Sequence, residues 1–264
     1  MHKRVHEHLI EAGKVTLLQV QADEIRVKAV GRIYWLASAL EVRSRLWLGA
    51  VIGGHRDATL IRSLLERIRR SGPPEHILLL VTDGLASYKS QALKVFRKPL
   101  HCGKEVGRPR LMLAEGVMMA RLIKRRQPKR VVEVLREVLC GAEAKVISRL
   151  IATQRSMRAV INTAYIERLQ ATFRARLVPL VRKTRAGAHK RSTLESGMWL
   201  VGGCYNFVWR HRSLGEERTP AEAAGLTDHR WSMEELLAFA RPPAQLPRWR
   251  GRKPKWLLEA EHAA

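Results

Sequence analysis

The stretch Leu78-Leu79-Leu80-Val81-Thr82-Asp83-Gly84-Leu85 places an acidic residue at the end of a continuously apolar run. Such a run is typical of a strand that is buried on both faces of a sheet. Gly84 lets the chain leave this strand in a backbone conformation that other residues avoid. Because open sheets bind ligands beyond the carboxyl ends of their strands, Asp83 is a candidate functional carboxylate.

A second acidic residue, Asp23, lies in a segment of alternating polar and apolar residues that runs from Val15 to Lys28. The alternation predicts a strand in which Gln19, Gln21 and Asp23 share the polar face. Glu24 would point to the opposite face. Aspartate is depleted in strands, so Asp23 needs an explanation. A bound cation is one explanation, and a solvated strand edge is the alternative.

A third acidic residue, Glu167, falls in a predicted helix that Asn162 or Thr163 can cap. One helix face is apolar, with residues three or four positions apart: Ile166, Leu169, Phe173 and Leu177. Glu167 lies about 100° from this stripe, at its border, where a side chain can face a cleft. The alternative is an ordinary solvated glutamate on a helix.

The remaining pattern predicts an α/β fold: a mixed sheet of about five strands flanked by helices, with a helical C-terminal extension. Further strands are expected at 31–40, 45–52, 117–123 and 130–139. Helices are expected at 5–12, 57–68, 87–96, 143–152, 193–209 and 231–239, and a basic loop at 98–110. The predicted organisation is a lead-in at 1–16, a catalytic domain at 17–180, its helical part at 181–240 and a basic flexible tail at 241–264.

Charge is the most informative feature of the composition. Among 264 residues, 49 Lys and Arg against 24 Asp and Glu give a net charge of +25, which indicates a polyanionic partner, with nucleic acid the default. A basic, ribosome-like protein without catalysis is the alternative. No apolar run approaches the ~18 residues of a membrane span. The three cysteines, Cys102, Cys140 and Cys204, are too scattered for a disulfide framework or structural zinc, so a cytoplasmic location is expected.

The three carboxylates suggest a metal-dependent reaction at a phosphodiester. Neighbouring carboxylates repel one another unless they are protonated or bridged. Oxygen ligands without Cys or His suit Mg²⁺ or Mn²⁺ rather than zinc. Two such ions, about 3.5–4 Å apart, can activate a water or a 3′-OH and stabilise the leaving oxygen.

Four blocks of the chain resemble bacterial insertion-sequence transposases with an RNase H-like DDE catalytic domain, of the integrase and transposase superfamily. They are Gln21-Ala22-Asp23-Glu24, Val81 to Tyr88, Ile161 to Leu169, and Tyr205-Asn206-Phe207 through His211-Arg212-Ser213-Leu214 to Thr219-Pro220. The likeness covers about residues 15 to 240.

The resemblance implies that Asp23, Asp83 and Glu167 form the catalytic triad and hold two Mg²⁺ or Mn²⁺ ions. It also implies cleavage of DNA strands at element ends and joining of the 3′-OH to target DNA. The expected partner is double-stranded DNA, both element ends and target. A homo-oligomer on DNA is expected because two ends must be brought together, as is a bacterial, nucleoid-associated location.

Basic residues near these motifs are candidate DNA contacts. A predicted hairpin tip at 124–129 is one group, with a soluble charged turn as the alternative, and the faces of the Glu167 helix carry another. His211 and Arg212 match the family's motif near the catalytic helix, in a supporting role. The full set is Lys124, Arg125, Arg126, Arg168, Arg174, Arg176, His211 and Arg212.

The chain departs from the family in one respect, because the Asp23 strand begins near residue 17. This leaves no room for the upstream module with which family members read the element ends. A separate polypeptide, the basic C-terminal arm or truncation of the chain would explain the difference. Two other functions stay open: a catalytically silent DNA-binding remnant, and a nuclease of the same fold that hydrolyses DNA without joining it.

Overall fold

A computed structural model of the chain describes residues 2–73, 78–100, 110–114, 116–128, 130–154, 156–181, 187–215 and 217–239. The predicted flexible tail at 241–264 lies outside these residues, as does most of the predicted basic loop. No helix within the described ranges is long and apolar enough to cross a membrane.

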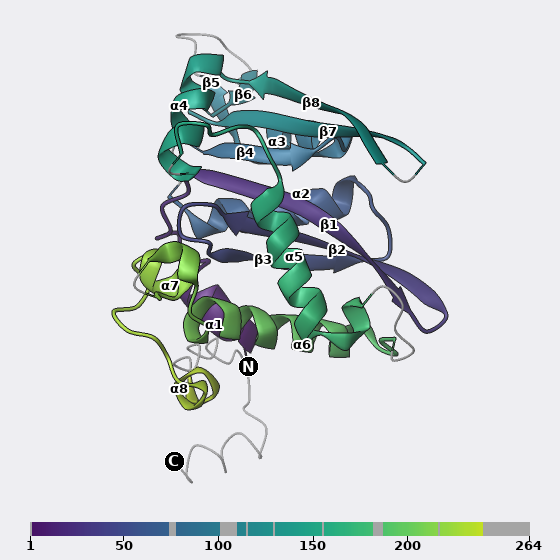
Figure 1. Cartoon of the computed structure of the whole chain (residues 1–264), viewed down its shortest axis with the longest axis vertical. Coiled ribbons are helices and arrows are strands. Elements are labelled where there is room, and N and C mark those ends of the chain that lie inside the picture. Colours follow the sequence, from purple (N-terminus) through teal and green to yellow (C-terminus); the bar gives the residue numbers. More distant parts are fainter. Residues whose placement is uncertain are drawn as a thin grey trace, which may run out of the picture.

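A mixed six-stranded sheet organises the molecule, in the order β3-β2-β1-β4-β7-β8 (Figure 1). Its strands are β1 (Gln19–Ala29), β2 (Arg32–Glu41), β3 (Trp47–Gly53), β4 (Leu79–Asp83), β7 (Met118–Gln127) and β8 (Arg130–Cys140). β4 is parallel to β1 and β7, whereas the β1–β2, β2–β3 and β7–β8 pairs are antiparallel. The predicted α/β class is confirmed, and the arrangement is consistent with an RNase H-like fold.

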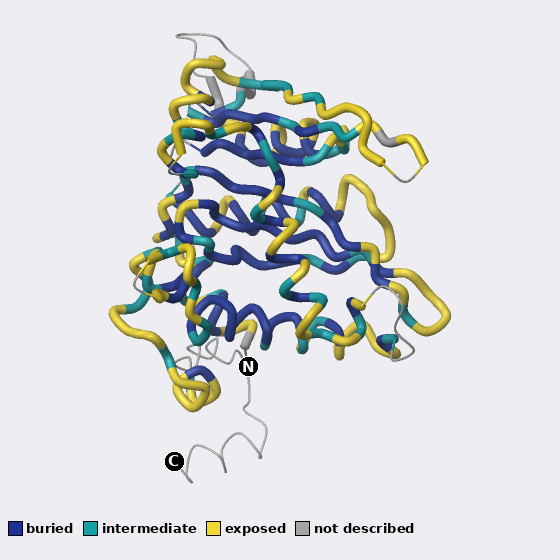
Figure 2. Tube along the Cα trace, viewed as in Figure 1, coloured by how far each residue is buried: buried dark blue, intermediate teal, exposed yellow. Residues whose placement is uncertain are grey.

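Helices cover both faces of this sheet. α2 (Ala58–Ser71) and α3 (Ala86–Val95) lie behind it in Figure 1, and α5 (Ala164–Arg176) crosses in front. α4 (Glu143–Gln154) and α6 (Arg191–Gly203) belong to the same side as α5. The central strands are consequently buried between two apolar layers (Figure 2). The remaining helices are α1 (His2–Leu9), α7 (Pro220–Ala223) and α8 (Met233–Ala238).

α2 illustrates how local sequence produces this packing. The side chain of Asp57 accepts a hydrogen bond from the backbone N–H of Leu60 at 2.9 Å and caps the helix, as predicted. The apolar residues of its inner face are fully buried against the sheet: Leu60, Ile61, Leu64, Leu65 and Ile68.

Each of the six strands of the main sheet falls in a segment where a strand was predicted, although the expected total was about five, and β8 forms the second edge of this sheet. Two predictions about the middle of the chain were wrong. β5 (Arg97–Leu100) and β6 (Arg110–Leu113) form a separate antiparallel pair at the ends of the predicted loop. β7 continues through Gln127, so residues 124–127 belong to a strand and not to a hairpin tip. Cross-strand ion pairs, such as Arg125 with Glu133, support this extension.

The helix predicted at 193–209 also differs. α6 ends at Gly203 and passes into a π-helical segment, Cys204–Val208. Within it, the Asn206 side chain pairs with the backbone N–H and carbonyl of Trp47, both at 2.9 Å, which ties this segment to β3. Gly202 lies so close to the Trp47 ring that an added Cβ would stand 1.8 Å from it. The helix and the strand can approach this closely only with glycine at this position.

Candidate active site

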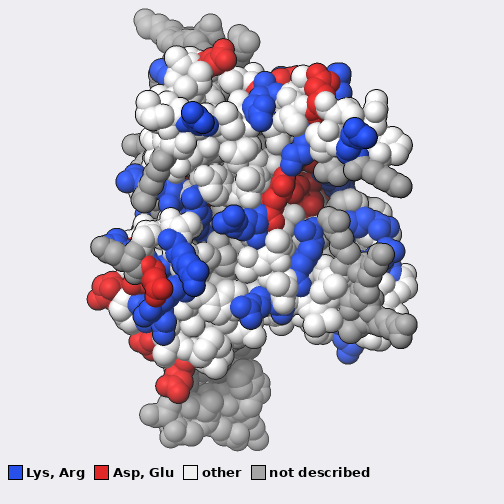
Figure 3. Space-filling view, viewed as in Figure 1, with Lys and Arg blue, Asp and Glu red and all other residues white. Residues whose placement is uncertain are grey.

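The three predicted carboxylates line one open cleft of about 480 Å³. Asp23 comes from β1, Asp83 from the end of β4 and Glu167 from the first turns of α5. Figure 3 shows acidic side chains gathered on this face of the molecule, with Lys and Arg side chains around them. Other residues that line the cleft include Arg56, Leu85, Lys124 and Thr163.

β1 is a central strand, paired with β2 and β4, so the alternative of a solvated strand edge for Asp23 does not apply. The side chain of Asp23 accepts hydrogen bonds from the Gln170 amide at 3.0 Å and from the backbone N–H of Glu24 at 2.8 Å. These donors fix one carboxylate on the α5 side of the sheet.

Gln21 places α5 over β1. This glutamine is fully buried, and its side-chain oxygen accepts from the backbone N–H groups of Tyr165 at 3.1 Å and Ile166 at 3.0 Å. Its amide nitrogen donates to the backbone carbonyl of Asn162 at 2.7 Å. The first turn of α5 is therefore held by the same strand that carries Asp23, and this fixes where Glu167 enters the cleft.

Glu167 and Asp83 are oriented by close neighbours. Thr163 donates its hydroxyl to Glu167 at 2.7 Å, and Lys124 forms an ion pair with the same carboxylate. Asp83 accepts from the backbone N–H of Leu85 at 3.0 Å. Leu85 follows Gly84, so the turn that ends β4 also holds its terminal carboxylate.

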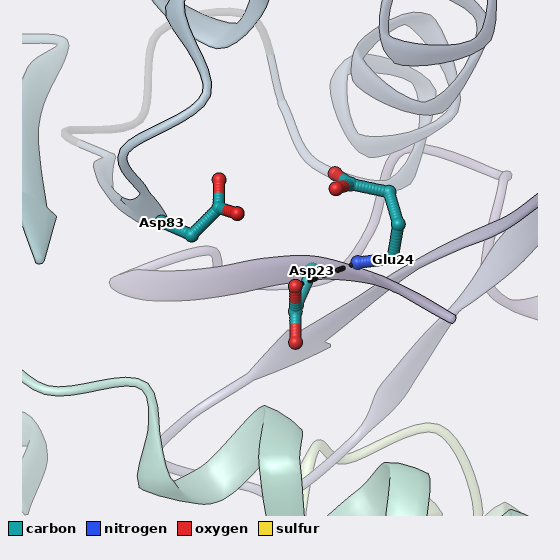
Figure 4. A group of neighbouring side chains, drawn as sticks. All are labelled: Asp23, Glu24 and Asp83. Carbon is teal, nitrogen blue, oxygen red and sulfur yellow. Dashed lines mark hydrogen bonds between the residues drawn. The ribbon is translucent and has the colours of Figure 1, made fainter. Parts of the chain in front are cut away.

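Glu24 and Arg56 complete the cluster, and neither was predicted as a site residue. A nitrogen of the Arg56 guanidinium lies 2.6 Å from Glu24 and 2.7 Å from Asp83. Tyr88 donates its hydroxyl to Glu24. One oxygen from each of Asp23, Glu24 and Asp83 lies within 4.8 Å of the others. In Figure 4, the side chains of Asp23 and Glu24 leave β1 on opposite sides, as the alternation of a strand requires, and Asp83 comes from the neighbouring strand β4.

The crowding of carboxylates shifts their pKa values. Burial raises the pKa of Asp23, and the negative charges of Asp83 and Glu167 raise it further. Burial and the charge of Asp83 likewise raise the pKa of Glu24, although Tyr88 and Arg56 oppose the shift. A divalent cation would relieve this repulsion, and the all-oxygen donor set suits Mg²⁺ or Mn²⁺. The three carboxylates whose oxygens lie closest together, Asp23, Glu24 and Asp83, therefore could hold a metal ion, and Glu167 lines the same cleft without belonging to this group.

The predicted DNA contacts occupy varied environments. Lys124 faces the cleft, and Arg125 pairs with Glu133 on β8 at 2.9 Å. Arg176 lies over the ring of Trp209, at 5.0 Å from its centroid. Arg168 and Arg212 are exposed, and Arg174 and His211 are partly buried. The side chain of Arg126 lies outside the described part of the chain.

No protein-family model matches the chain, and no curated protein matches it in sequence. Among solved structures, it is similar to a chain of the cryo-EM structure of the simian T-cell lymphotropic virus intasome in complex with PP2A regulatory subunit B56 gamma. The TM-score is 0.42 at 10% identity, and the match covers 92% of this chain. It covers 60% of the other chain, so this chain spans less than two thirds of that length.

Proposed function

We propose that the chain is a DDE-type transposase that carries out metal-dependent cleavage of DNA strands and strand transfer. The observation that supports this most strongly is the convergence of three carboxylates, from β1, β4 and α5, on one cleft. The resemblance of the four sequence blocks to insertion-sequence transposases supports the same reaction.

In this proposal Asp23, Asp83 and Glu167 hold two Mg²⁺ or Mn²⁺ ions. The ions, when bound, would activate a water or a 3′-OH and stabilise the leaving oxygen. The chain itself orients the ligands through the N–H of Leu85 and the amide of Gln170. Because Arg56 and Lys124 already pair with acids of the cleft, they would offset part of the negative charge of the metal-free site.

The proposed partner is double-stranded DNA, at the element ends and the target, bound by a homo-oligomer of this chain. The net charge of +25 would hold a polyanion against the acidic cleft. Lys124, Arg125, Arg126, Arg168, Arg174, Arg176, His211 and Arg212 are the proposed contacts. A separate DNA-reading module or polypeptide would supply recognition of the element ends, and the protein would act on the bacterial nucleoid.

The test is an assay with a labelled duplex that carries the flanking element end, incubated with Mg²⁺ or Mn²⁺ and, in parallel, with EDTA. Joined products that require metal are expected from the wild-type chain. Asp23→Asn, Asp83→Asn and Glu167→Gln should each lose them while still binding DNA. Glu66→Gln, at an exposed position of α2, is a control that should retain activity. A triad variant with near-normal joining would remove that residue from the proposed site.

A catalytically silent DNA-binding protein is the second candidate. The ion pairs of Arg56 with Asp83 and of Lys124 with Glu167 favour it, because carboxylates that are already paired can be purely structural. In the same assay, this candidate predicts binding with neither cleavage nor joining in any metal. Cleaved but unjoined products would instead indicate a nuclease that only hydrolyses.

A further inference from the structure

A second cleft lies on the other flank of α5 and differs from the acidic one in the chemistry of its lining. Its volume is about 310 Å³. We call this cleft the Arg45 pocket. Its polar and aromatic lining includes Arg45, Tyr165, Arg168, Tyr205, His211 and Ser213. Its lining contains two tyrosines, two arginines and a histidine but no carboxylate, so it lacks the acidic oxygen ligands that Mg²⁺ and Ca²⁺ prefer.

The Arg45 side chain presents a planar cation on a rigid base. Its guanidinium carbon lies 4.0 Å from the centroid of the Tyr165 ring, and the guanidinium also donates to the backbone carbonyl of Val42. The turn beneath it is held by the buried Glu41, which accepts from the backbone N–H of Ser44 at 2.7 Å. Arg45 itself adopts a φ of 62°, a conformation that ordinary residues rarely adopt. The surrounding turn therefore fixes the position of the guanidinium before any ligand binds.

The opposite wall comes from the segment that follows α6. The rings of Tyr205 and His211 meet edge to face, with centroids 4.4 Å apart and planes at 77°. Among the described residues, no partner is found for the buried Nε2 of His211. An unpaired buried nitrogen is unfavourable unless a ligand or water completes its hydrogen bonding. This wall therefore combines aromatic surface with unused hydrogen-bonding capacity.

The position of the pocket relates it to the acidic cleft. Glu167 lines the cleft and Arg168, the next residue of α5, lines the Arg45 pocket. A helix with its side chains is about 10–12 Å across. Stacked nucleotides are spaced ~3.4 Å apart along a strand. A strand whose phosphodiester lies in the cleft could therefore place a base a few nucleotides away in the pocket.

We infer that the Arg45 pocket binds an unstacked nucleobase of the DNA strand that enters the carboxylate cleft, an inference that rests on the proposed function. Proteins bind splayed-out bases by stacking them on aromatic rings or on guanidinium planes, and Tyr165 with Arg45 offers both. A bare phosphate would leave the aromatic walls without a role. Arg168, exposed at the rim, would contact the adjoining phosphate.

The experiment compares two short oligonucleotides of equal length, one of deoxyadenylate and one made only of abasic sites, which has the same phosphates without bases. Affinities are measured by fluorescence anisotropy in EDTA. The wild-type chain should prefer the oligodeoxyadenylate by about 5- to 100-fold, the range expected for stacking of one base. Tyr165→Leu should lower this ratio by at least about fivefold and leave the affinity for the abasic strand unchanged.

Three further variants sharpen the result. Tyr165→Phe keeps the ring and should keep the ratio. Arg45→Lys keeps the charge but loses the plane, so it should lower the ratio even if Tyr165→Leu fails to fold. Arg168→Gln should weaken binding of both strands equally. An unchanged ratio in both Tyr165→Leu and Arg45→Lys would overturn the inference.

Because the affinities are measured without metal, the two proposals can fail separately. A base preference that depends on Tyr165, in a chain that forms no joined products, would retain the pocket and reject the transposase. Joined products from a chain that shows no base preference would retain the transposase and reject the pocket.

Discussion

Two sets of hydrogen-bonded carboxylates near the β1–β2 pair, Glu41 by itself and the acids of the cleft, are satisfied in different ways. Glu41, at the end of β2, accepts from the backbone N–H of Arg43 at 3.1 Å and from both the N–H and the hydroxyl of Ser44. These donors lie within three residues of Glu41, and the backbone N–H of Gln19 on the neighbouring strand β1 adds another. In the cleft, by contrast, Glu24 and Asp83 share the guanidinium of Arg56, which belongs to a distant part of the chain.

The two groups also differ electrostatically. Burial raises the pKa of Glu41, and its hydrogen-bond donors oppose the shift. Burial also raises the pKa of Asp23, but there the charges of two other carboxylates add to it. Donors on the local backbone cannot leave a carboxylate, whereas a long cationic side chain can give way to a metal ion. Glu41 is therefore satisfied by fixed donors, whereas a bound cation could replace the counter-ions of the cleft.

The largest loss of stability should come from removing the carboxylate of Glu41. Glu41→Leu leaves the N–H groups of Arg43 and Ser44 unpaired in the interior. We expect the free energy of unfolding to fall by about 3 kcal/mol or more. Urea denaturation would measure the change, with Glu66→Leu on the exposed face of α2 as the matched control, within about 0.5 kcal/mol of wild type. Equal losses in both variants would contradict the contrast.

Binding of a metal ion to the cleft should raise the free energy of unfolding. Mg²⁺ at about 100 times its dissociation constant should raise the free energy of unfolding by about 2.7 kcal/mol. Asp83→Asn should abolish this gain, because the repulsion that favours a cation and one of its ligands are both lost. Asp228→Asn, fully exposed elsewhere, is the control and should respond as wild type does. Full stabilisation of Asp83→Asn by Mg²⁺ would place the ion elsewhere.

A smaller change, here an increase in the free energy of unfolding, is expected from Asp23→Asn in the absence of metal. The pKa of Asp23 is higher in the folded chain than in the unfolded chain, so ionisation costs folding free energy. Wild type should therefore lose stability as the pH rises from the unfolded value through the folded one. At neutral pH, Asp23→Asn should be the more stable by about 1 kcal/mol.

Urea denaturation in EDTA between about pH 4 and 7 would follow this difference, which should grow with pH. A variant that is less stable than wild type at every pH would show that the hydrogen bonds of Asp23 outweigh the repulsion.

The smallest effect should come from the counter-ion of Glu167. The pair with Lys124 is partly exposed, so Lys124→Gln should change the free energy of unfolding by less than about 1 kcal/mol. The midpoint of a Mg²⁺ titration should nevertheless move to lower concentration, because a competing cation is gone. Arg125→Gln, whose partner Glu133 lies outside the cleft, should leave the midpoint unchanged.

The sequence was most informative where a pattern is local. Alternation identified the strand that carries Asp23, and an apolar run followed by glycine identified the end of β4 at Asp83. The helix of Glu167 also followed from its apolar stripe. These patterns depend only on residues a few positions apart, which is why they can be recognised without the fold.

The partners of these carboxylates could not be recognised in this way. Nothing in the sequence around Arg56 links it to Glu24 or Asp83, because their contact depends on how β3, α2 and β4 cross. Gln21 was predicted only as part of a polar face, although it holds the start of α5. Lys124 was expected at a hairpin tip as a phosphate contact, and its ion pair with Glu167 shows that β7 reaches the cleft.

The wide spacing of the three acids along the chain has a consequence for biosynthesis. During translation, residues up to Gln154 can emerge from the ribosome with β1, β4 and the whole sheet but without α5. Such a nascent chain carries Asp23 and Asp83 yet lacks the third wall of the cleft. Chains that stall or are cleaved before residue 164 therefore cannot assemble the complete cleft, and the activity proposed here would await synthesis of a later helix.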